Sequence, residues 1–395
     1  MPGMSGLPRL LRCATVVIEP REERQFSLVD LIEGGSGLRT EKKWIAYALH
    51  LEQEVEITGE EVLALAHFSS RGPESPEVGL EPPNPSIVQA LLDKSLLFDL
   101  DAQPTPESAC DQRLRTLPWW PLAGIAHQFS RWEGVESGEL AGRVGLSRPQ
   151  DLLARFGPPP PAVPEDETAF GLRRLPTPRR NGFDELMARR ATCRNFDRSV
   201  ELSQDDLSNL LMRSFGALAI ETYGDSIDAL KKNSPSAGGL HPIEAYVLVQ
   251  RVTGITPGRY RYHALENALL PLDPALPAIA PKLLLAGQAW FADAPVLVVL
   301  AVRFRRNFWK YREHAKAYRG VLLDAGHLAQ TFQLSATDQG LGAFVTAAIN
   351  EKEIERCLGL DPVESGVLAV CGAGSRSAQQ SFAEFDPLER VWPQS

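Results

Sequence analysis

The chain has 395 residues and a formal net charge of −9, with a mass of 43.4 kDa and an isoelectric point of about 5.4. The length predicts two or three domains rather than one core, and the acidic balance argues against general nucleic-acid binding. No apolar run approaches the roughly 20 residues that cross a membrane, and the first twenty residues lack a secretory apolar stretch, so we expect a cytoplasmic protein. The five cysteines lack paired metal-ligand spacing, which argues against a metal site and for reduced thiols.

Residues 1–156 predict an N-terminal domain of strands and helices. Its expected elements are a strand over 13–19, a helix over 58–69, and a second helix followed by a short strand over 84–100. Thr58 and Glu61 have the spacing of a capping box at the start of the first helix. Helix, loop, helix and strand in this order are typical of a winged-helix fold, and the acidic surroundings of the second helix favour a peptide over DNA as its ligand.

An aromatic-rich segment follows over 113–132, with Trp119, Trp120 and Trp132 near His127. We interpret it as a helical segment that packs the N-terminal part of the chain. An exposed aromatic patch that captures substrate is the alternative.

A proline-rich linker is predicted over 157–182, because its four consecutive prolines and acidic cluster exclude a helix or a central strand. Beyond it, residues 183–395 predict a second domain of alternating helices and strands. Residues 183–196 are expected to form a helix that runs into a turn, and further helices are expected over 203–218 and 318–342. The expected strands cover 242–251, 295–304 and 365–374. One stripe of the long helix is expected to be fully apolar, which predicts a central or dimer-interface helix: Leu322, Ala325, Ala329, Phe332 and Ala336.

Arg190, Thr192 and Arg194 form the first motif with chemical potential. Two guanidinium groups and a hydroxyl within five residues suit a phosphate monoester. A solvated basic helix end is the alternative.

The segment Lys231–Gln250 is the second motif. Its small residues Ser236–Gly239 leave the backbone almost bare beside a buried strand, which suits the close approach of a flat or phosphorylated ligand but also describes an ordinary loop. His241 begins the strand and is interpreted as structural.

Lys310 and Tyr311 are adjacent, and either becomes a useful general base only if its pKa is lowered. Adjacent side chains of a regular helix diverge by about 100°, so a shared pocket requires an irregular turn. A Lys-Tyr pair on an ordinary amphipathic surface is the alternative.

Gly340 and Gly342 resemble a helix C-cap that feeds a close-packed turn, and Arg376 follows the last strand as a further cation. No dinucleotide fingerprint or Walker-type phosphate loop is present.

Together these pieces resemble the SagB-type dehydrogenases, the peptide-modifying branch of the FMN-dependent nitroreductase superfamily. The similarity runs in collinear order over about residues 180–376 and is carried by "RRATCRNF", "LSQDDLSNLL", "SPSAGGLHPIEAYVL", "GRYRYH", "AGQAWFADAPVLVVLAVRF", "WKYREHAKAYRGVLLDAGHLAQ" and "ATDQGLGAF". Ala191 stands where the family usually has a polar or basic residue, and Thr192 replaces the common Ser.

The resemblance implies an α+β fold with a mixed sheet flanked by helices, a homodimer, and FMN at the subunit interface. By the family's pattern, the FMN phosphate is held by Arg190, Thr192 and Arg194. The same pattern assigns the isoalloxazine ring to Ser234, Pro235, Ser236, Ala237 and Gly238, with Gly340, Leu341 and Gly342 near the ring and Arg376 as a further cation.

The resemblance also implies oxidation of thiazolines or oxazolines to azoles in a ribosomally made peptide, with Lys310 and Tyr311 tied to Cα proton abstraction. It leaves open which of the two is the base. A separate cyclodehydratase is expected as partner, because no such portion is apparent in this chain. The alternatives are an NAD(P)H-dependent nitroreductase or flavin reductase, and a peptide-binding scaffold without turnover.

Overall fold

A computed structural model describes residues 9–72, 83–143, 145, 148–163, 173–224 and 227–392. The chain forms two compact units. Unit 1 comprises Met1–Arg131 and Arg305–Tyr318, and unit 2 comprises Trp132–Phe304 and Arg319–Ser395. In the described residues no helix is both long enough and apolar enough to cross a membrane.

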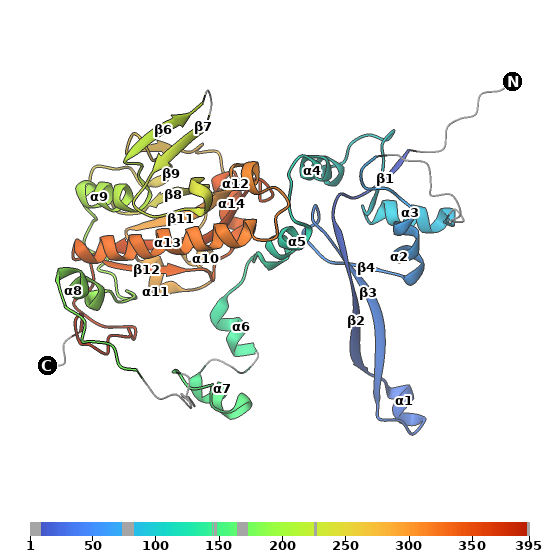
Figure 1. Cartoon of the computed structure of the whole chain (residues 1–395). Helices are drawn as coiled ribbons and strands as arrows, with labels where there is room; N and C mark the ends of the chain where they lie inside the picture. The colour runs from blue at the N-terminus through green and yellow to red at the C-terminus, as the bar shows by residue number, and fades with distance from the viewer. Residues whose placement is uncertain are drawn as a thin grey trace. The chain divides into compact units, whose positions relative to one another are not determined.

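Unit 1 contains two small antiparallel sheets and several short helices (Figure 1). Its strands are β1 (Leu10–Arg12), β2 (Val16–Phe26), β3 (Leu38–Ala48), β4 (Val55–Ile57) and β5 (Leu97–Asp99). Its helices are α1 (Leu28–Ile32), α2 (Gly59–Ala66), α3 (Pro85–Asp93), α4 (Pro106–Arg115), α5 (Pro121–Ser130) and α12 (Phe304–Tyr311), whose first residue is the last of a unit 2 segment.

The expected order of helix, helix and strand in unit 1 is confirmed by α2, α3 and β5. Thr58 and Glu61 form the predicted capping box at the start of α2. The predicted first strand continues to Phe26 and pairs with β3 along its whole length, from Val16 opposite Ala48 to Phe26 opposite Leu38. The long β2–β3 hairpin therefore precedes the two helices, and β5 pairs with β1.

The core of unit 1 lies between α2, α3 and the two sheets, around Cys13, Ala46, Leu65, Leu91 and Leu97. Burial raises the pKa of the Cys13 thiol to about 12, so this thiol stays protonated near neutral pH.

The aromatic segment over 113–132 spans two helices, α4 and α5, instead of one. Trp119 is 5% exposed, stacks on His127 and meets Phe308 edge to face at 4.7 Å between ring centroids. The interpretation of this segment as packing is confirmed for Trp119.

Unit 2 is built on a six-stranded sheet in the order β10-β9-β8-β11-β13-β12. These strands are β8 (Ile243–Val249), β9 (Gly258–His263), β10 (Ala268–Pro271), β11 (Val296–Arg303), β12 (Gly342–Thr346) and β13 (Ser365–Gly374), with β6 (Ala219–Tyr223) and β7 (Ile227–Lys231) as a separate hairpin. The helices are α6 (Ser137–Arg143), α7 (Pro149–Phe156), α8 (Gly182–Arg189), α9 (Gln204–Phe215), α10 (Pro281–Leu284), α11 (Ala289–Ala292), α13 (Ala317–Asp338), which begins in unit 1, and α14 (Glu351–Leu358).

The α+β class is confirmed. Each strand pair in the large sheet is antiparallel, and parallel pairing enters at the isolated bridge between Thr192 and Ala343 beside β12. In the described residues, the strand pairs of the predicted mixed sheet are thus antiparallel, and parallel pairing occurs at the isolated bridges Thr192–Ala343 and Leu202–Val252.

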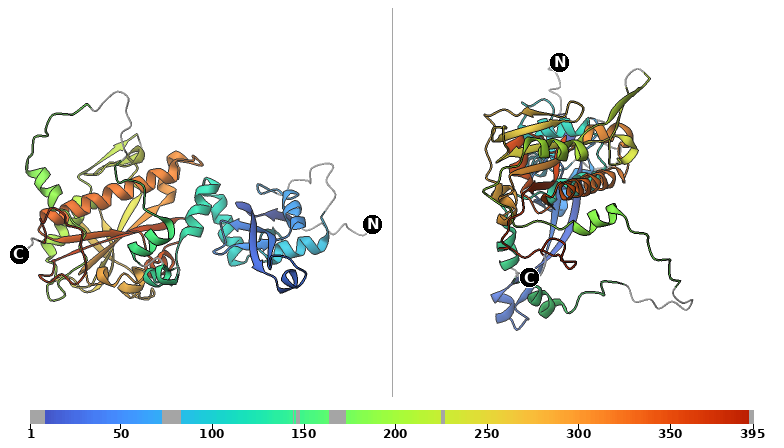
Figure 2. Two further views of the ribbon diagram at one scale, coloured as in Figure 1. Left: turned by 90° about the horizontal axis from the view of Figure 1, so that it is seen from below. Right: turned by 90° about the vertical axis from the view of Figure 1, so that its left-hand side faces the viewer.

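Helices cover the large sheet, and α13 runs along one of its faces (Figure 2). The other face packs on α10, α11 and α14 through a core that includes Phe291, Leu297, Val299 and Ile354. Four residues of the apolar stripe predicted for α13 are buried, namely Ala325, Ala329, Phe332 and Ala336, whereas Leu322 is 47% exposed. Because 3.6 residues complete a turn, the buried face at this end of α13 includes Val321 and Leu328 beside the predicted Ala325.

The units divide near residue 131, whereas the proline-rich segment predicted a boundary at 156. Residues after 131 are bonded to the start of α14: the Trp132 N–H donates to Glu351 Oε2 at 2.8 Å, and the Val135 N–H donates to Asn350 Oδ1 at 2.8 Å. These bonds place the segment with unit 2. Of the predicted linker, residues 157–163 and 173–181 are described and form neither helix nor strand, and 164–172 lie outside the described residues.

Candidate functional site

The residues predicted to hold a phosphate converge at the β12 edge of the sheet. Arg190 follows the last residue of α8 and donates to Gln333 Oε1 at 3.1 Å. Thr192 bridges to Ala343, and Arg376 Nη2 donates to the Ala191 carbonyl oxygen at 3.3 Å. Segments almost 190 residues apart in the chain therefore place two guanidinium groups and a hydroxyl in one region.

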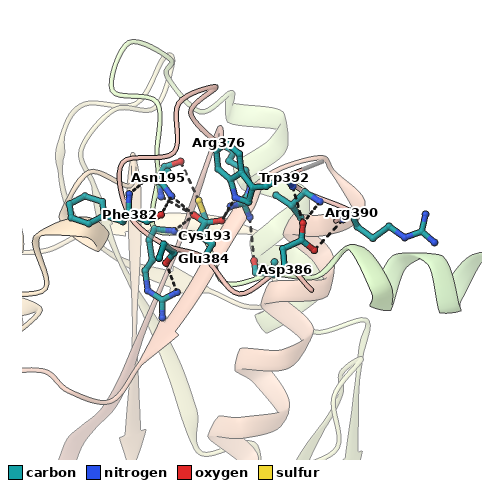
Figure 3. Close-up of polar contacts among 12 residues, drawn as sticks. Cys193, Asn195, Arg376, Phe382, Glu384, Asp386, Arg390 and Trp392 are labelled. Carbon is teal, nitrogen blue, oxygen red and sulfur yellow. Dashed lines mark hydrogen bonds and ion pairs between the residues drawn. The ribbon is translucent and has the colours of Figure 1, made fainter. Parts of the chain in front are cut away.

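A buried carboxylate, Glu384, shares this region (Figure 3). Its side chain is 0% exposed and forms an ion pair with Arg376. It also accepts hydrogen bonds from the Arg194 N–H at 2.5 Å, from the Asn195 N–H at 3.1 Å and from Trp392 Nε1 at 2.8 Å. One anion, the Glu384 carboxylate, therefore already lies among the donors of this region.

Residues 375–392 form a C-terminal segment, called the strap below, that is hydrogen-bonded to the side chain of Asn195. The Asn195 side chain donates to the Phe382 carbonyl and to Glu384, and it accepts from the Ser381 and Phe382 N–H groups (Figure 3). Arg194 Nη1 donates to the Ala383 carbonyl at 3.3 Å, so the structure connects Arg194 to the strap and not to Arg190. Sequence reasoning missed the strap, since nothing in its residues marks Glu384 as a partner of the distant motif.

The predicted ring-binding segment, Ser234–Gly238, is fixed to α13. Ser234 Oγ lies 2.7 Å from Thr331 Oγ1. Asp324, 3% exposed, accepts from Ser236 Oγ and, at 2.9 Å, from the Ala237 N–H. The buried carboxylate of Asp324 on α13 therefore fixes the backbone of this turn.

The predicted C-cap after α13 is confirmed. Gly340 has a φ of +73°, and the Leu341 N–H donates to the Ala336 carbonyl, as in a left-handed helix end. A Cβ at Gly342 would lie 2.6 Å from Cys193 Sγ, so this position accepts only glycine without a shift of its neighbours. The turn therefore packs directly against the Arg190–Arg194 motif at Cys193.

Lys310 and Tyr311 end α12 and belong to unit 1. Arg312, the next residue, has a φ of +48°, so the irregular turn follows the pair, and Lys310 and Tyr311 themselves lie in the helix, where adjacent side chains diverge by about 100°. Lys310 Nζ lies 5.7 Å from the centroid of the Tyr311 ring.

The helix α12 is anchored within unit 1 by its buried side. Phe308 is 2% exposed and packs on Trp119, while Asn307 is 1% exposed and donates to the Ala317 carbonyl at 3.1 Å. Lys310 is exposed and Tyr311 is half-buried. The residues predicted to bind the cofactor all lie in unit 2.

Two sequence comparisons decide the family. A profile described as the nitroreductase family matches residues 187–374. Over 154 residues the chain is 31% identical to a Methanocaldococcus jannaschii protein named as a nitroreductase, and the match spans 38% of this chain and 75% of that protein. The chain belongs to the nitroreductase family.

This nitroreductase-family chain is also 31% identical, over 176 residues, to the trifolitoxin-processing protein TfxB of Rhizobium leguminosarum bv. trifolii. That match spans 43% of this chain and 46% of TfxB, so the chain spans less than half of this relative's length. The predicted resemblance is confirmed for the nitroreductase family, and the relationship to TfxB extends it toward the SagB-type branch.

Solved structures give weaker similarities. The Escherichia coli microcin synthetase McbBCD complex with truncated pro-MccB17 bound matches at 20% identity and a TM-score of 0.47, over 65% of this chain and 93% of the matched chain. A nitroreductase structure from Ralstonia eutropha matches at 20% identity and a TM-score of 0.40, over 52% of this chain and 89% of that one. TM-scores below 0.5 add nothing to the family assignment.

Nitroreductase-family proteins are oxidoreductases that generally bind FMN, and two observations in this chain fit that group. A Cβ added at Gly239, directly after the Ser234–Gly238 segment, or at Gly340 would meet no atom of a residue beyond its chain neighbours within 4 Å, so open space lies beside bare backbone at both positions. Donors of the kind that a phosphate requires are supplied by Arg190, Thr192 and the side of Arg376 that is turned toward Ala191. The buried Cys193 does not compete as a nucleophile, because burial raises its thiol pKa to about 12.

Proposed function

We propose that this protein is an FMN-dependent dehydrogenase that oxidises azolines to azoles in a ribosomally made peptide. The observation that carries the proposal is the 31% identity to the trifolitoxin-processing protein TfxB in a chain that also has the adjacent Lys310 and Tyr311. The convergence of Arg190, Thr192 and Arg376 supports FMN as the cofactor.

In this proposal each group of residues has a defined role. Arg190, Thr192 and Arg376 hold the phosphate, with Arg194 holding the strap beside them. Ser234–Gly238 and Gly340–Gly342 line the ring with backbone, since bulky side chains there would keep a flat group away. FMN, when bound, supplies the acceptor for the hydride that leaves the azoline.

The chain itself supplies the base. Lys310 or Tyr311 removes the azoline Cα proton, and a reacting distance of about 3 to 3.5 Å is required for that transfer. Both residues lie in the last turn of α12, directly before the left-handed Arg312. Either residue can serve as the base in the reaction as proposed.

The partners follow from the same proposal. A precursor peptide is the substrate, unit 1 is its binding module, and a separate cyclodehydratase makes the azoline. The active form is a homodimer, in which the exposed Leu322 and Leu323 of α13 provide apolar surface for a second copy.

A test begins with the visible spectrum of the purified protein after incubation with FMN. The expected result is a stable yellow protein, and failure to retain added FMN would remove the proposal. In the yellow protein, Lys310→Ala and Tyr311→Phe are expected to abolish azole formation on a thiazoline peptide with the flavin still bound. Unchanged oxidation in both variants would refute the assignment of the base, and rapid flavin reduction by NAD(P)H would favour a general nitroreductase instead.

A further inference from the structure

A cavity of about 340 Å³ lies in unit 2, where Lys232, the residue after β7, meets β8, β9 and the last residue of β11. Its charged lining consists of Lys232, Arg261, Arg303 and Glu244. His241 and His263 add imidazole groups, and Phe215, Leu230, Ile243 and Leu265 supply an apolar wall. The cavity is therefore lined by three cationic side chains and one carboxylate.

The one carboxylate already has a cationic partner. Arg303 Nε lies 3.2 Å from Glu244 Oε1, so these two charges offset each other. Lys232 and Arg261 are the two cationic side chains of the lining that do not belong to this ion pair. The lining consequently carries an excess of positive charge that an anion would offset.

Lys232 is the most buried of these charges, with 7% of its surface exposed. Its Nζ donates to the Phe215 carbonyl oxygen at 2.7 Å, and a neutral carbonyl satisfies one of three ammonium protons without balancing the charge. Burial lowers the pKa of Lys232 to about 8, although Glu244 opposes the shift. Near neutral pH the buried amine is still protonated, and a bound anion would stabilise it.

The cavity adjoins the segment proposed for the flavin ring. Lys232, His241 and Ile243 also line a small neighbouring cavity together with Ser236 and Asp324. The His241 N–H donates to Ser236 Oγ at 2.9 Å, and His241 holds a left-handed φ of +46°. This strained backbone links the positive cavity directly to the Ser234–Gly238 turn.

We propose that this cavity is a binding site for a carboxylate group, held by Lys232 and Arg261 against the apolar wall. A monoanion matches the lining better than phosphate, because Glu244 repels a second negative charge. The carboxylate belongs either to a peptide, as an acidic side chain or C-terminus, or to a free small acid. That the site orients a peptide beside the ring rests on the proposed function, whereas carboxylate binding itself does not.

Isothermal titration of the full chain with acetylated dipeptide acids, their C-terminal amides, acetate and inorganic phosphate tests the site. The acid is expected to bind at least about tenfold more tightly than its amide, a difference of about 1.4 kcal/mol. Acetate that binds as tightly as the acetylated dipeptide acid identifies a free acid as the source, and tighter binding of the dipeptide acid identifies a peptide. Equal binding of acid and amide, or tighter binding of phosphate, overturns the proposal.

Variants locate the binding in this cavity. Lys232→Met, which keeps the length of the side chain and removes its charge, and Arg261→Gln, at an exposed residue, should each abolish the preference for acid over amide. Lys231→Met is the matched control, since Lys231 is the exposed neighbour in the chain, and it should keep the preference. A preference that survives in Arg261→Gln and Lys232→Met also overturns the proposal. Loss of carboxylate binding with normal FMN retention separates this site from the proposed flavin site.

Discussion

Replacement of Glu384 by glutamine is expected to destabilise unit 2 strongly. The carboxylate is fully buried and paired with Arg376, and it accepts from two backbone N–H groups, from Asn195 Nδ2 and from Trp392 Nε1. A glutamine of the same shape removes the charge and turns an NH₂ group toward donors. Breaking a buried ion pair from one side costs about 3–5 kcal/mol, because the other charge remains buried without a partner.

Differential scanning calorimetry measures the effect on the unit 2 transition. For a folding unit of this size, about 1 kcal/mol lowers Tm by roughly 2–4 °C, so Glu384→Gln should lower Tm by about 6–20 °C. Glu389→Gln, at an exposed residue of the same strap, should change Tm by less than about 2 °C. A Glu384→Gln transition within about 2 °C of the wild type would refute the inference that the strap is locked by this carboxylate.

Three further results are expected. Trp119→Ala should slow azole formation by roughly 10²-fold in single-turnover assays without loss of FMN, because Trp119 packs against the helix that carries the proposed base. Trp119→Phe, the control, should restore most of the rate. Loss of flavin from the Trp119→Ala variant would contradict the reasoning. Lys232 has a folded-state pKa of about 8 against an ordinary 10.5, so the unfolded state binds more protons at this residue between the two values. The free energy of unfolding of the wild type relative to Lys232→Met should therefore rise by about 3 kcal/mol from pH 8 to 10.5, at about 1.4 kcal/mol for each pH unit. Urea denaturation of both proteins measures this difference, and parallel pH profiles would exclude the contribution of Lys232. Gly342→Ala should lower the free energy of unfolding by about 1–3 kcal/mol, because the added Cβ clashes with Cys193. In the same denaturation series, Gly326→Ala should stabilise α13 by up to about 1 kcal/mol, since its Cβ meets no atom of a distant residue within 4 Å. Equal effects at both glycines would contradict the close packing of Gly342 on Cys193.

Local signals in the sequence predicted much of the fold. The capping box at Thr58, the continuous apolar run of β11 and the glycine that ends α13 each act within a few residues, so the pattern was sufficient. The strand β3 escaped prediction because its outer part is charged. There Lys43 pairs with Glu23 across the hairpin and with Glu56 on the next strand, contacts that stabilise a solvated arm without apolar alternation.

The candidate site was less accessible from the sequence, because its parts meet across long separations. Arg190 and Thr192 were recognisable as an anion motif, but Glu384, 190 residues beyond Arg194, carries no local mark of its role. The grouping of Lys310 with unit 1 depends on the contact between Phe308 and Trp119, which is a tertiary property of two distant apolar residues. The exposure of Leu322 likewise could not be predicted from the apolar stripe, since burial at a helix end depends on what packs there.

The most direct test of the proposed function is anaerobic mixing of the FMN-loaded protein with a thiazoline-containing peptide, followed by the visible absorption of the oxidised flavin. The account predicts that the peptide bleaches the flavin with formation of one thiazole per flavin, and that the corresponding uncyclised cysteine peptide does not. A flavin that stays oxidised with the thiazoline peptide but is bleached rapidly by NAD(P)H would contradict it.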